Sequence, residues 1–113
     1  MSDCLFCEIV AHELDADIVH ETPNTLAFRD IHPVAPTHVL VIPKRHVATS
    51  QELGTGSGDL LAELFETIKM VAEHADVDAG YRLVTNVGAA AGQTVPHLHF
   101  HVIGGRPLSW PPG

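Results

Sequence analysis

The chain has 113 residues, of which 45% are hydrophobic and 18% are charged, and its formal net charge is −8 at pH 7. That length predicts one domain, residues 1–113, and the scattered Lys and Arg residues exclude the basic stripe that binds a nucleic-acid polymer. No apolar run approaches the ~20 residues that span a bilayer, and no signal-peptide pattern opens the chain, so we expect a cytoplasmic protein without a membrane partner.

The first half of the chain predicts one short helix and three strands. Residues 16–22 and 25–31 are two strand-like segments on either side of the turn signal TPN. Residues 37–43 form an apolar, β-branched run that stops at a proline, which is typical of an interior strand. Before these strands, apolar residues recur at helical spacing: Leu5, Phe6, Ile9 and Val10.

The second half predicts one long helix and two more strands. After the flexible stretch GTGSG, apolar residues recur every three or four positions over residues 59–74, which indicates an amphipathic helix. Residues 81–86 and 96–104 are strand-like, and a glycine-containing loop, residues 87–93, lies between them. We therefore predict an α+β fold: about five strands in a largely antiparallel sheet, one long helix and one short helix.

Three histidines alternate in the last predicted strand. His97, His99 and His101 would share one face of the strand, about 6.5–7 Å apart, while the apolar residues between them face the core. Solvent-facing strand residues are usually Lys, Glu or Thr, so three imidazoles indicate chemistry. They could ligate a metal that keeps an open position for water, or they could attack phosphorus and transfer protons. The three histidines alone leave both interpretations open.

The loop before these histidines favours a phosphate ligand. Gly88 and Gly92 let a ligand approach the backbone closely, and Gln93 and Thr94 add polar groups. Such a loop can offer backbone N–H groups to an anion, although a glycine-containing loop between strands is most often only a turn. Its position just before the histidines favours a phosphate over a bare metal.

The motif HLHFHV, residues 97–102, resembles the histidine triad of the family of nucleotide hydrolases and transferases named after it. The similarity continues in the family's order through LAFRDIHPVAPTHVLVIPKRH, RLVTNVG, GQTVPHLHFHVIGGR and WPPG, which covers nearly the whole chain. The ending GGRPLSWPPG is most similar to the Hint branch, the purine nucleoside phosphoramidases. The resemblance implies the histidine-triad (HIT) fold, a purine nucleotide substrate and a homodimer.

The resemblance also implies covalent catalysis. His99 would attack the α-phosphorus of AMP joined to an amine or to lysine, and water would then release the nucleotide from the imidazole. His101 would contact the phosphate or protonate the leaving amine, and His38 would support and orient His99. His97 would hold the site together. No cofactor is implied for the chemistry itself.

A nucleotide site follows from the same resemblance. Asp30 would accept hydrogen bonds from both ribose hydroxyls. The base would stack in an apolar slot formed by Ile18, Phe28 and Ile31, which without the family would be ordinary core residues. The residues implied for the phosphate are Asn86, Gly92, Gln93 and Thr94.

Cys4 and Cys7 form a Cys-x-x-Cys pair near the N-terminus. In a cytosolic chain this spacing indicates a metal or redox site before a disulfide, and a redox pair typically follows a buried strand, for which there is no room here. Tetrahedral zinc needs two further ligands. Some bacterial relatives are thought to supply them from the positions that correspond to His46 and His97, which implies a structural zinc. Two isolated structural cysteines are the alternative.

Some features depart from the family's pattern and leave other functions open. The loop has AAA without the acidic residue that often stands there, and Pro96 replaces an aromatic residue that is common in the Hint branch. The alternative within the family is a dinucleoside polyphosphate hydrolase or a nucleotidylyl transferase. Outside it, the alternatives are a non-catalytic purine-nucleotide-binding module and a zinc hydrolase that uses the triad as ligands.

Overall fold

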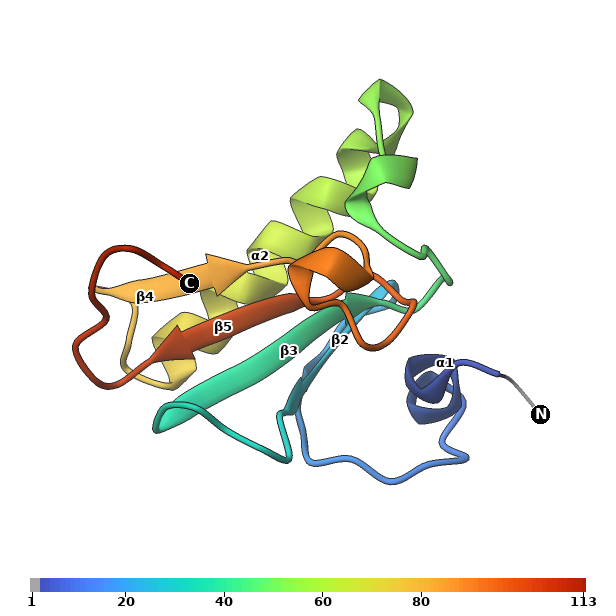
Figure 1. Cartoon of the computed structure of the whole chain (residues 1–113). Helices are drawn as coiled ribbons and strands as arrows, with labels where there is room; N and C mark the ends of the chain where they lie inside the picture. The colour runs from blue at the N-terminus through green and yellow to red at the C-terminus, as the bar shows by residue number, and fades with distance from the viewer. Residues whose placement is uncertain (1–2) are drawn as a thin grey trace.

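The computed structural model describes residues 3–113. They form an antiparallel sheet with a helix on each face (Figure 1). Its strand order is β1-β2-β3-β5-β4, and every neighbouring pair is antiparallel. This arrangement confirms the predicted α+β class. The elements are α1 (Leu5–Val10), β1 (Ile18–Glu21), β2 (Thr25–Arg29), β3 (Thr37–Pro43), α2 (Gly58–His74), β4 (Tyr81–Val84) and β5 (Phe100–Gly104), with short 3-10 turns at Ser50–Glu52, Thr55–Ser57 and Ala89–Ala91.

The central strand β3 is buried on both of its faces because each face meets a different helix. Val39 and Val41 belong to a core that includes residues of α2, whereas Leu40 and Ile42 pack with residues of α1. Successive strand side chains point to opposite faces, so a strand between two helices needs apolar residues at every position. This explains the unbroken apolar run in the sequence.

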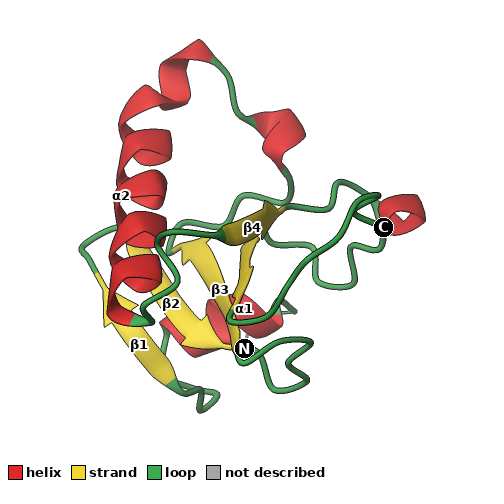
Figure 2. Cartoon of the chain, turned by 90° about the vertical axis from the view of Figure 1, so that its left-hand side faces the viewer, coloured by secondary structure: helices red, strands yellow, loops and turns green. Residues whose placement is uncertain are grey.

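The two helices differ in length and in what they cover. Helix α2 buries Leu64, Ile68 and Val71 against one face of the sheet, and Figure 2 shows it running beside the strands. Helix α1 has only six residues, and it buries Phe6 and Ile9 on the other face. No helix within residues 3–113 combines the length and the apolar character that crossing a membrane requires.

The last strand is shorter than the sequence predicts. We expected residues 96–104, but β5 begins at Phe100. The preceding segment pairs with the chain that follows β3, since the Leu98 amide donates to the Val47 carbonyl oxygen over 2.6 Å. The predicted alternation of core residues and histidines is still observed, because Leu98, Phe100 and Val102 all pack into the core under α2.

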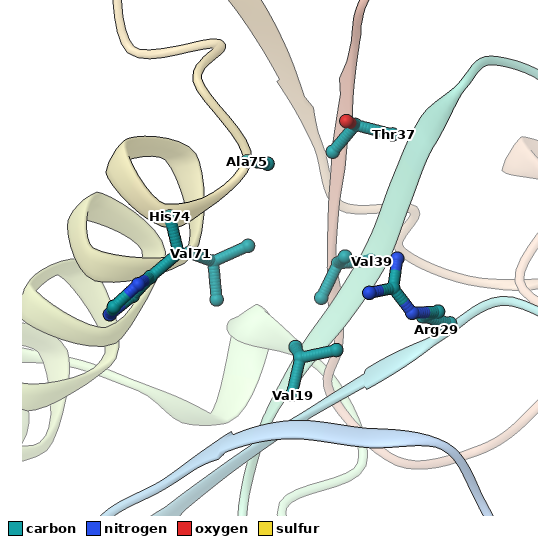
Figure 3. Close-up of a pocket in the computed structure, with 7 residues that line it drawn as sticks. All are labelled: Val19, Arg29, Thr37, Val39, Val71, His74 and Ala75. Carbon is teal, nitrogen blue, oxygen red and sulfur yellow. The ribbon is translucent and has the colours of Figure 1, made fainter.

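A small cavity lies between α2 and the sheet (Figure 3). Val19, Val39 and Val71 line it together with Arg29 and His74, and its volume is about 80 Å³. A water molecule occupies about 30 Å³ of liquid, so this space is too small for a nucleotide. The triad histidines lie on the opposite face of the sheet.

Candidate active site

The three triad histidines line up on the face of the sheet that carries α1. His97 and His99 are buried, with 0% and 5% of their surface exposed, and His101 is partly buried. The ring centroids of His99 and His101 are 5.0 Å apart. Phe6 of α1 packs edge-on against His99 and His97. The histidines therefore form one contiguous row against the N-terminal helix.

The hydrogen bond of His99 determines which of its ring nitrogens carries a lone pair. His99 Nδ1 lies 2.7 Å from the backbone carbonyl oxygen of His97. A carbonyl oxygen only accepts, so Nδ1 carries the proton. A neutral imidazole has one N–H group, which leaves a lone pair on Nε2. Because His99 also lines a cavity, this lone pair is the one available to a ligand there.

A second hydrogen-bond chain fixes the protons of His38 and His101. The Val34 amide donates to His38 Nδ1 over 3.1 Å, so the His38 proton is on Nε2. That nitrogen lies 2.9 Å from His101 Nδ1 and donates to it, which leaves the His101 proton on Nε2. Asp30 Oδ2 lies 3.4 Å from His38 Nε2. The chain thus presents His101 as a hydrogen-bond donor.

This arrangement shows the direct partner of His38. We expected it to orient His99, but its hydrogen bond goes to His101. The register of the strands explains the difference. His38 on β3 pairs with Ile103 and Leu40 pairs with His101, so His38 lies diagonally across from His101. His99 lies two residues further away along the chain.

The environment of His101 keeps its ring neutral. Burial is the main cause that lowers its pKa, to about 4; the nearby His99 and His38 lower it further, and Asp30 opposes them. The ring is therefore uncharged in the unliganded protein near neutral pH. A bound phosphate would raise this pKa, because negative charge favours the imidazolium form.

A cavity of about 370 Å³ opens beside these histidines. This volume falls in the range of about 300–1,000 Å³ that is usual for small-molecule sites. Its polar and charged lining comprises Asp15, Arg29, Asp30, Thr94, His99 and His101. Most of its apolar lining comes from α1, the loop after it and the strands: Leu5, Phe6, Ile9, Leu14, Phe28 and Leu40.

The cavity includes two of the three residues expected around a base. Phe28 and Ile31 line it, and Ile31 is 85% exposed. Ile18 pairs with Phe28 across β1 and β2 but is not part of the cavity wall, to which Leu14 from the preceding loop contributes. We missed the α1 side of the cavity, although the apolar spacing of Phe6 and Ile9 was a signal for it.

The glycine loop uses most of its own amides. The Gly92 amide donates to Ala89, the Gln93 amide donates to Gly88, and the Gln93 side chain bonds to the Gly88 amide and to the carbonyl oxygens of Ala48 and Val95. The Gln93 side chain therefore braces the loop. Thr94 lines the cavity, and its amide makes no hydrogen bond within residues 3–113.

The remaining phosphate candidates lie beside Thr94. Gly92 has a positive φ of 95°, a conformation that favours glycine, and a methyl group on it would lie 3.8 Å from Asn86 Nδ2. Asn86 and Gly92 thus meet at one point of the loop, though neither is part of the cavity wall. Groups of this region that could contact an anion include the Asn86 side chain and the Thr94 amide and hydroxyl.

The family model of the HIT domain matches residues 11–108. The chain belongs to the HIT domain family. A HIT-like protein of Synechococcus elongatus is 49% identical over 111 residues, which cover 98% of this chain and 97% of that one. A HIT family hydrolase from Legionella pneumophila superposes with a TM-score of 0.95 at 47% identity, covering 98% of this chain and 100% of the other. A histidine triad nucleotide-binding protein from Candida albicans gives a TM-score of 0.83 at 32% identity, covering 96% and 83%.

This HIT domain carries a Cys/His cluster that could hold a metal. The ligand atoms of Cys4, Cys7, His46 and His97 all lie within 4.8 Å of one another. His97 Nδ1 is 3.3 Å from Cys4 Sγ and 3.6 Å from Cys7 Sγ, and His46 Nδ1 is 3.3 Å from Cys7 Sγ. Tetrahedral zinc bonds place sulfur and nitrogen ligands about 3.6 Å apart. The four residues therefore fit a zinc ion.

The proton positions in the cluster also fit a metal. His97 Nε2 lies 2.8 Å from the carbonyl oxygen of Pro43 and must carry the proton, so the lone pair is on Nδ1, the nitrogen that faces the sulfurs. Burial is the main cause that lowers the pKa of His97, which keeps the ring neutral as ligation requires. A ligating histidine usually donates its other N–H in this way.

A second group, Asp30, His38 and His101, also brings three ligand atoms within 4.8 Å. Its hydrogen bonds disfavour a metal, however. The Val34 amide occupies the lone pair of His38 Nδ1, so the proton stays on Nε2, the nitrogen that would have to bind the ion. The triad itself does not converge either, since His97 faces the cysteines. The geometry therefore argues against the zinc-hydrolase alternative.

Proposed function

We propose that this HIT protein is an enzyme that hydrolyses purine nucleoside 5′-phosphoramidates through a covalent nucleotidyl intermediate on His99. The observation that carries the proposal is the hydrogen bond from His99 Nδ1 to the His97 carbonyl oxygen, which leaves Nε2 as a nucleophile at the cavity. The Legionella relative is named a hydrolase and the Candida relative a nucleotide-binding protein, which supports a nucleotide substrate.

The reaction would proceed by two displacements at the α-phosphorus. His99 Nε2 forms a bond to phosphorus as the bond from phosphorus to the amine nitrogen breaks. The negative phosphate raises the pKa of His101, so that this ring takes up a proton from solvent as the substrate binds and passes a proton to the leaving amine. Water then attacks phosphorus, the bond to His99 breaks, and the water proton restores His101. The net reaction consumes one water and yields a nucleoside monophosphate and an amine.

The remaining cavity residues would bind the nucleotide. The Asp30 Oδ1 atom accepts from the His32 amide, which holds the carboxylate in place beside the cavity for the ribose hydroxyls. The base would stack against Phe28 and Ile31, in a slot completed by α1. Asn86 and Thr94 would contact the phosphate.

The deciding experiment is release of AMP from adenosine 5′-phosphoramidate by the wild type, His99→Ala and the control His74→Ala, which alters an exposed histidine on α2. We expect turnover by the wild type and the control and none by folded His99→Ala. ATP and diadenosine polyphosphate serve as comparison substrates. Preference for diadenosine polyphosphate would favour the alternative branch of the family, and AMP binding without any turnover would favour a binding module.

We also propose that Cys4, Cys7, His46 and His97 hold a structural zinc ion. The support is the spacing of their ligand atoms and the proton position on His97, as described above. The ion would supply rigidity and not chemistry, because His99 is outside the ligand set and keeps its own lone pair.

We further propose that the protein is a homodimer. Among residues 3–113, strand β4 is at the edge of the sheet and pairs only with β5, so its outer backbone groups can bond to another strand. A groove of about 470 Å³ runs between β4 and the C-terminal tail, where Trp110 is 83% exposed. Sedimentation should give about twice the chain mass of 12.1 kDa for the wild type and a weaker dimer for Trp110→Ala. A wild-type monomer would rule this out.

A further inference from the structure

Helix α1 and its N-cap contribute residues to both the Cys/His cluster and the nucleotide cavity. Cys4 caps its N-terminus and Cys7 lies in its first turn, and both thiols belong to the metal cluster. Leu5, Phe6 and Ile9 of the same six-residue segment line the nucleotide cavity. A helix this short is not stable alone in water, so it depends on its tertiary contacts. The cluster and the cavity wall therefore cannot move independently.

Phe6 is the contact between these two sites. Only 7% of its surface is exposed. Its ring centroid lies 5.9 Å from that of His97, a candidate metal ligand, and 5.1 Å from that of His99, the candidate nucleophile. It also lies 5.3 Å from Phe28, on the cavity wall. All three contacts are edge-to-face, an arrangement that fixes ring orientation as well as distance.

The backbone of His97 provides a second connection. The ring of this residue points at the cysteine sulfurs, while its carbonyl oxygen accepts the Nδ1 proton of His99. Any movement of His97 therefore moves the acceptor that sets the tautomer of His99. His99 thus packs against the Phe6 ring and donates a hydrogen bond to the His97 carbonyl oxygen. The positions of both Phe6 and His97 depend on the metal cluster.

We propose that Phe6 is a positioning residue for His99, and that metal occupancy of the Cys/His cluster and nucleotide occupancy of the cavity favour each other through α1. The inference rests on the proposed function in that the ligand is a nucleotide and the ion is zinc. Coupling between two binding sites is reciprocal, so zinc strengthens AMP binding by the same factor by which AMP strengthens zinc binding. We expect a factor of about five, at the lower end of typical couplings.

Two binding measurements test the coupling without reference to turnover. Calorimetry gives the Kd of AMP for the zinc-loaded and the chelator-treated protein, and we expect a Kd about fivefold lower with zinc. A chromogenic chelator reports zinc release, which should be slower when AMP is present at saturation. Equal AMP affinity in the two forms, together with zinc release that AMP does not alter, would overturn the proposal.

Substitutions then test the role of Phe6. Phe6→Leu keeps an apolar side chain but removes the edge-to-face contacts, and we expect the coupling to fall to about twofold or less. In the zinc-loaded variant kcat should fall more than KM rises, because the nucleophile is misplaced while the apolar wall persists. Phe65→Leu, the same change at a half-exposed position on the other face, is the matched control and should leave both quantities unchanged.

The outcomes separate this inference from the proposed function. Phosphoramidate turnover combined with zinc-independent AMP affinity would overturn the coupling alone. Zinc-dependent AMP affinity without turnover would overturn the hydrolase proposal and support the coupling. Phe6→Met is the second variant should Phe6→Leu fail to fold, since methionine fills a similar volume. Full coupling and unchanged kcat in either folded variant would exclude Phe6 as the positioning residue.

Discussion

His38 Nε2 lies 2.9 Å from His101 Nδ1, and the Val34 amide donates to the other ring nitrogen of His38. The Val34 amide, in the loop before β3, therefore determines the tautomer of His38, and His38 in turn determines the tautomer of His101. The result is a proton on His101 Nε2, while the neighbouring ring of His99, whose centroid is 5.0 Å away, has its lone pair on Nε2. A donor and a nucleophile next to each other are what a displacement at phosphorus requires.

His38→Ala should lower kcat by roughly 10²-fold with little change in KM, because His101 would lose the partner that fixes its proton. His38→Gln should restore part of the activity, since its amide N–H can donate to His101 Nδ1. Steady-state kinetics with adenosine 5′-phosphoramidate measures both. Wild-type kcat in His38→Ala would show that His101 does not depend on this hydrogen bond.

Acid should destabilise the fold through His101. Burial lowers its pKa from 6.5 to about 4 in the folded protein, so between these values the unfolded chain binds more protons. Stability that is present above pH 6.5 is therefore lost as the pH falls toward 4. The loss is at most about 1.4 kcal/mol per pH unit, less solvent screening at this partly exposed ring.

Urea unfolding of chelator-treated protein at pH 7 and pH 5 measures this loss without interference from metal release. We expect His101→Gln to lose less stability between the two pH values than the wild type does, because its side chain does not titrate. Identical losses in both proteins would assign the acid sensitivity to other groups, such as His97, whose pKa is also lowered by burial.

The fold could be predicted from the sequence because periodicity reports burial directly. The apolar run of β3 and the three- and four-residue spacing in α2 gave the right elements, since both patterns follow from which faces the core covers. The start of β5 could not be predicted in this way. The segment around Leu98 is extended and alternates like a strand, but its hydrogen bond goes to Val47, and only the tertiary structure shows this pairing.

Part of the candidate site could also be predicted from the sequence. Residue identity pointed to the histidines and to the Cys/His cluster, whose ligand atoms the structure brings together. Hydrogen-bond partners are not encoded in local spacing, so the sequence could not show that His38 bonds to His101 or that Gln93 braces its own loop. Nor could it show that Leu14 and not Ile18 lines the cavity, which depends on the path of the loop before β1.

Gln93→Ala should destabilise the protein by about 1.5–4.5 kcal/mol, because three hydrogen bonds are lost and each contributes about 0.5–1.5 kcal/mol. The KM for a phosphoramidate should rise, since the loop that presents Thr94 loosens. Gln51→Ala is the matched control at an exposed position, and it should change neither quantity. A large loss of kcat in Gln93→Ala without loss of stability would instead indicate that Gln93 contacts the phosphate.

Metal removal should lower stability, and His46 offers a way to test it without disturbing the core. The wild type should hold one zinc per chain, and free zinc at a hundredfold above its Kd should add about 2.7 kcal/mol to the free energy of unfolding. His46 is exposed, so His46→Gln removes a ligand atom at the surface and should weaken zinc binding by about 10-fold or more. His74→Gln changes an exposed histidine outside the cluster and should bind zinc like the wild type. Metal content by mass spectrometry and thermal unfolding with and without chelator give the comparison, and zinc binding that is equal in the two variants would exclude His46 from the ligand set.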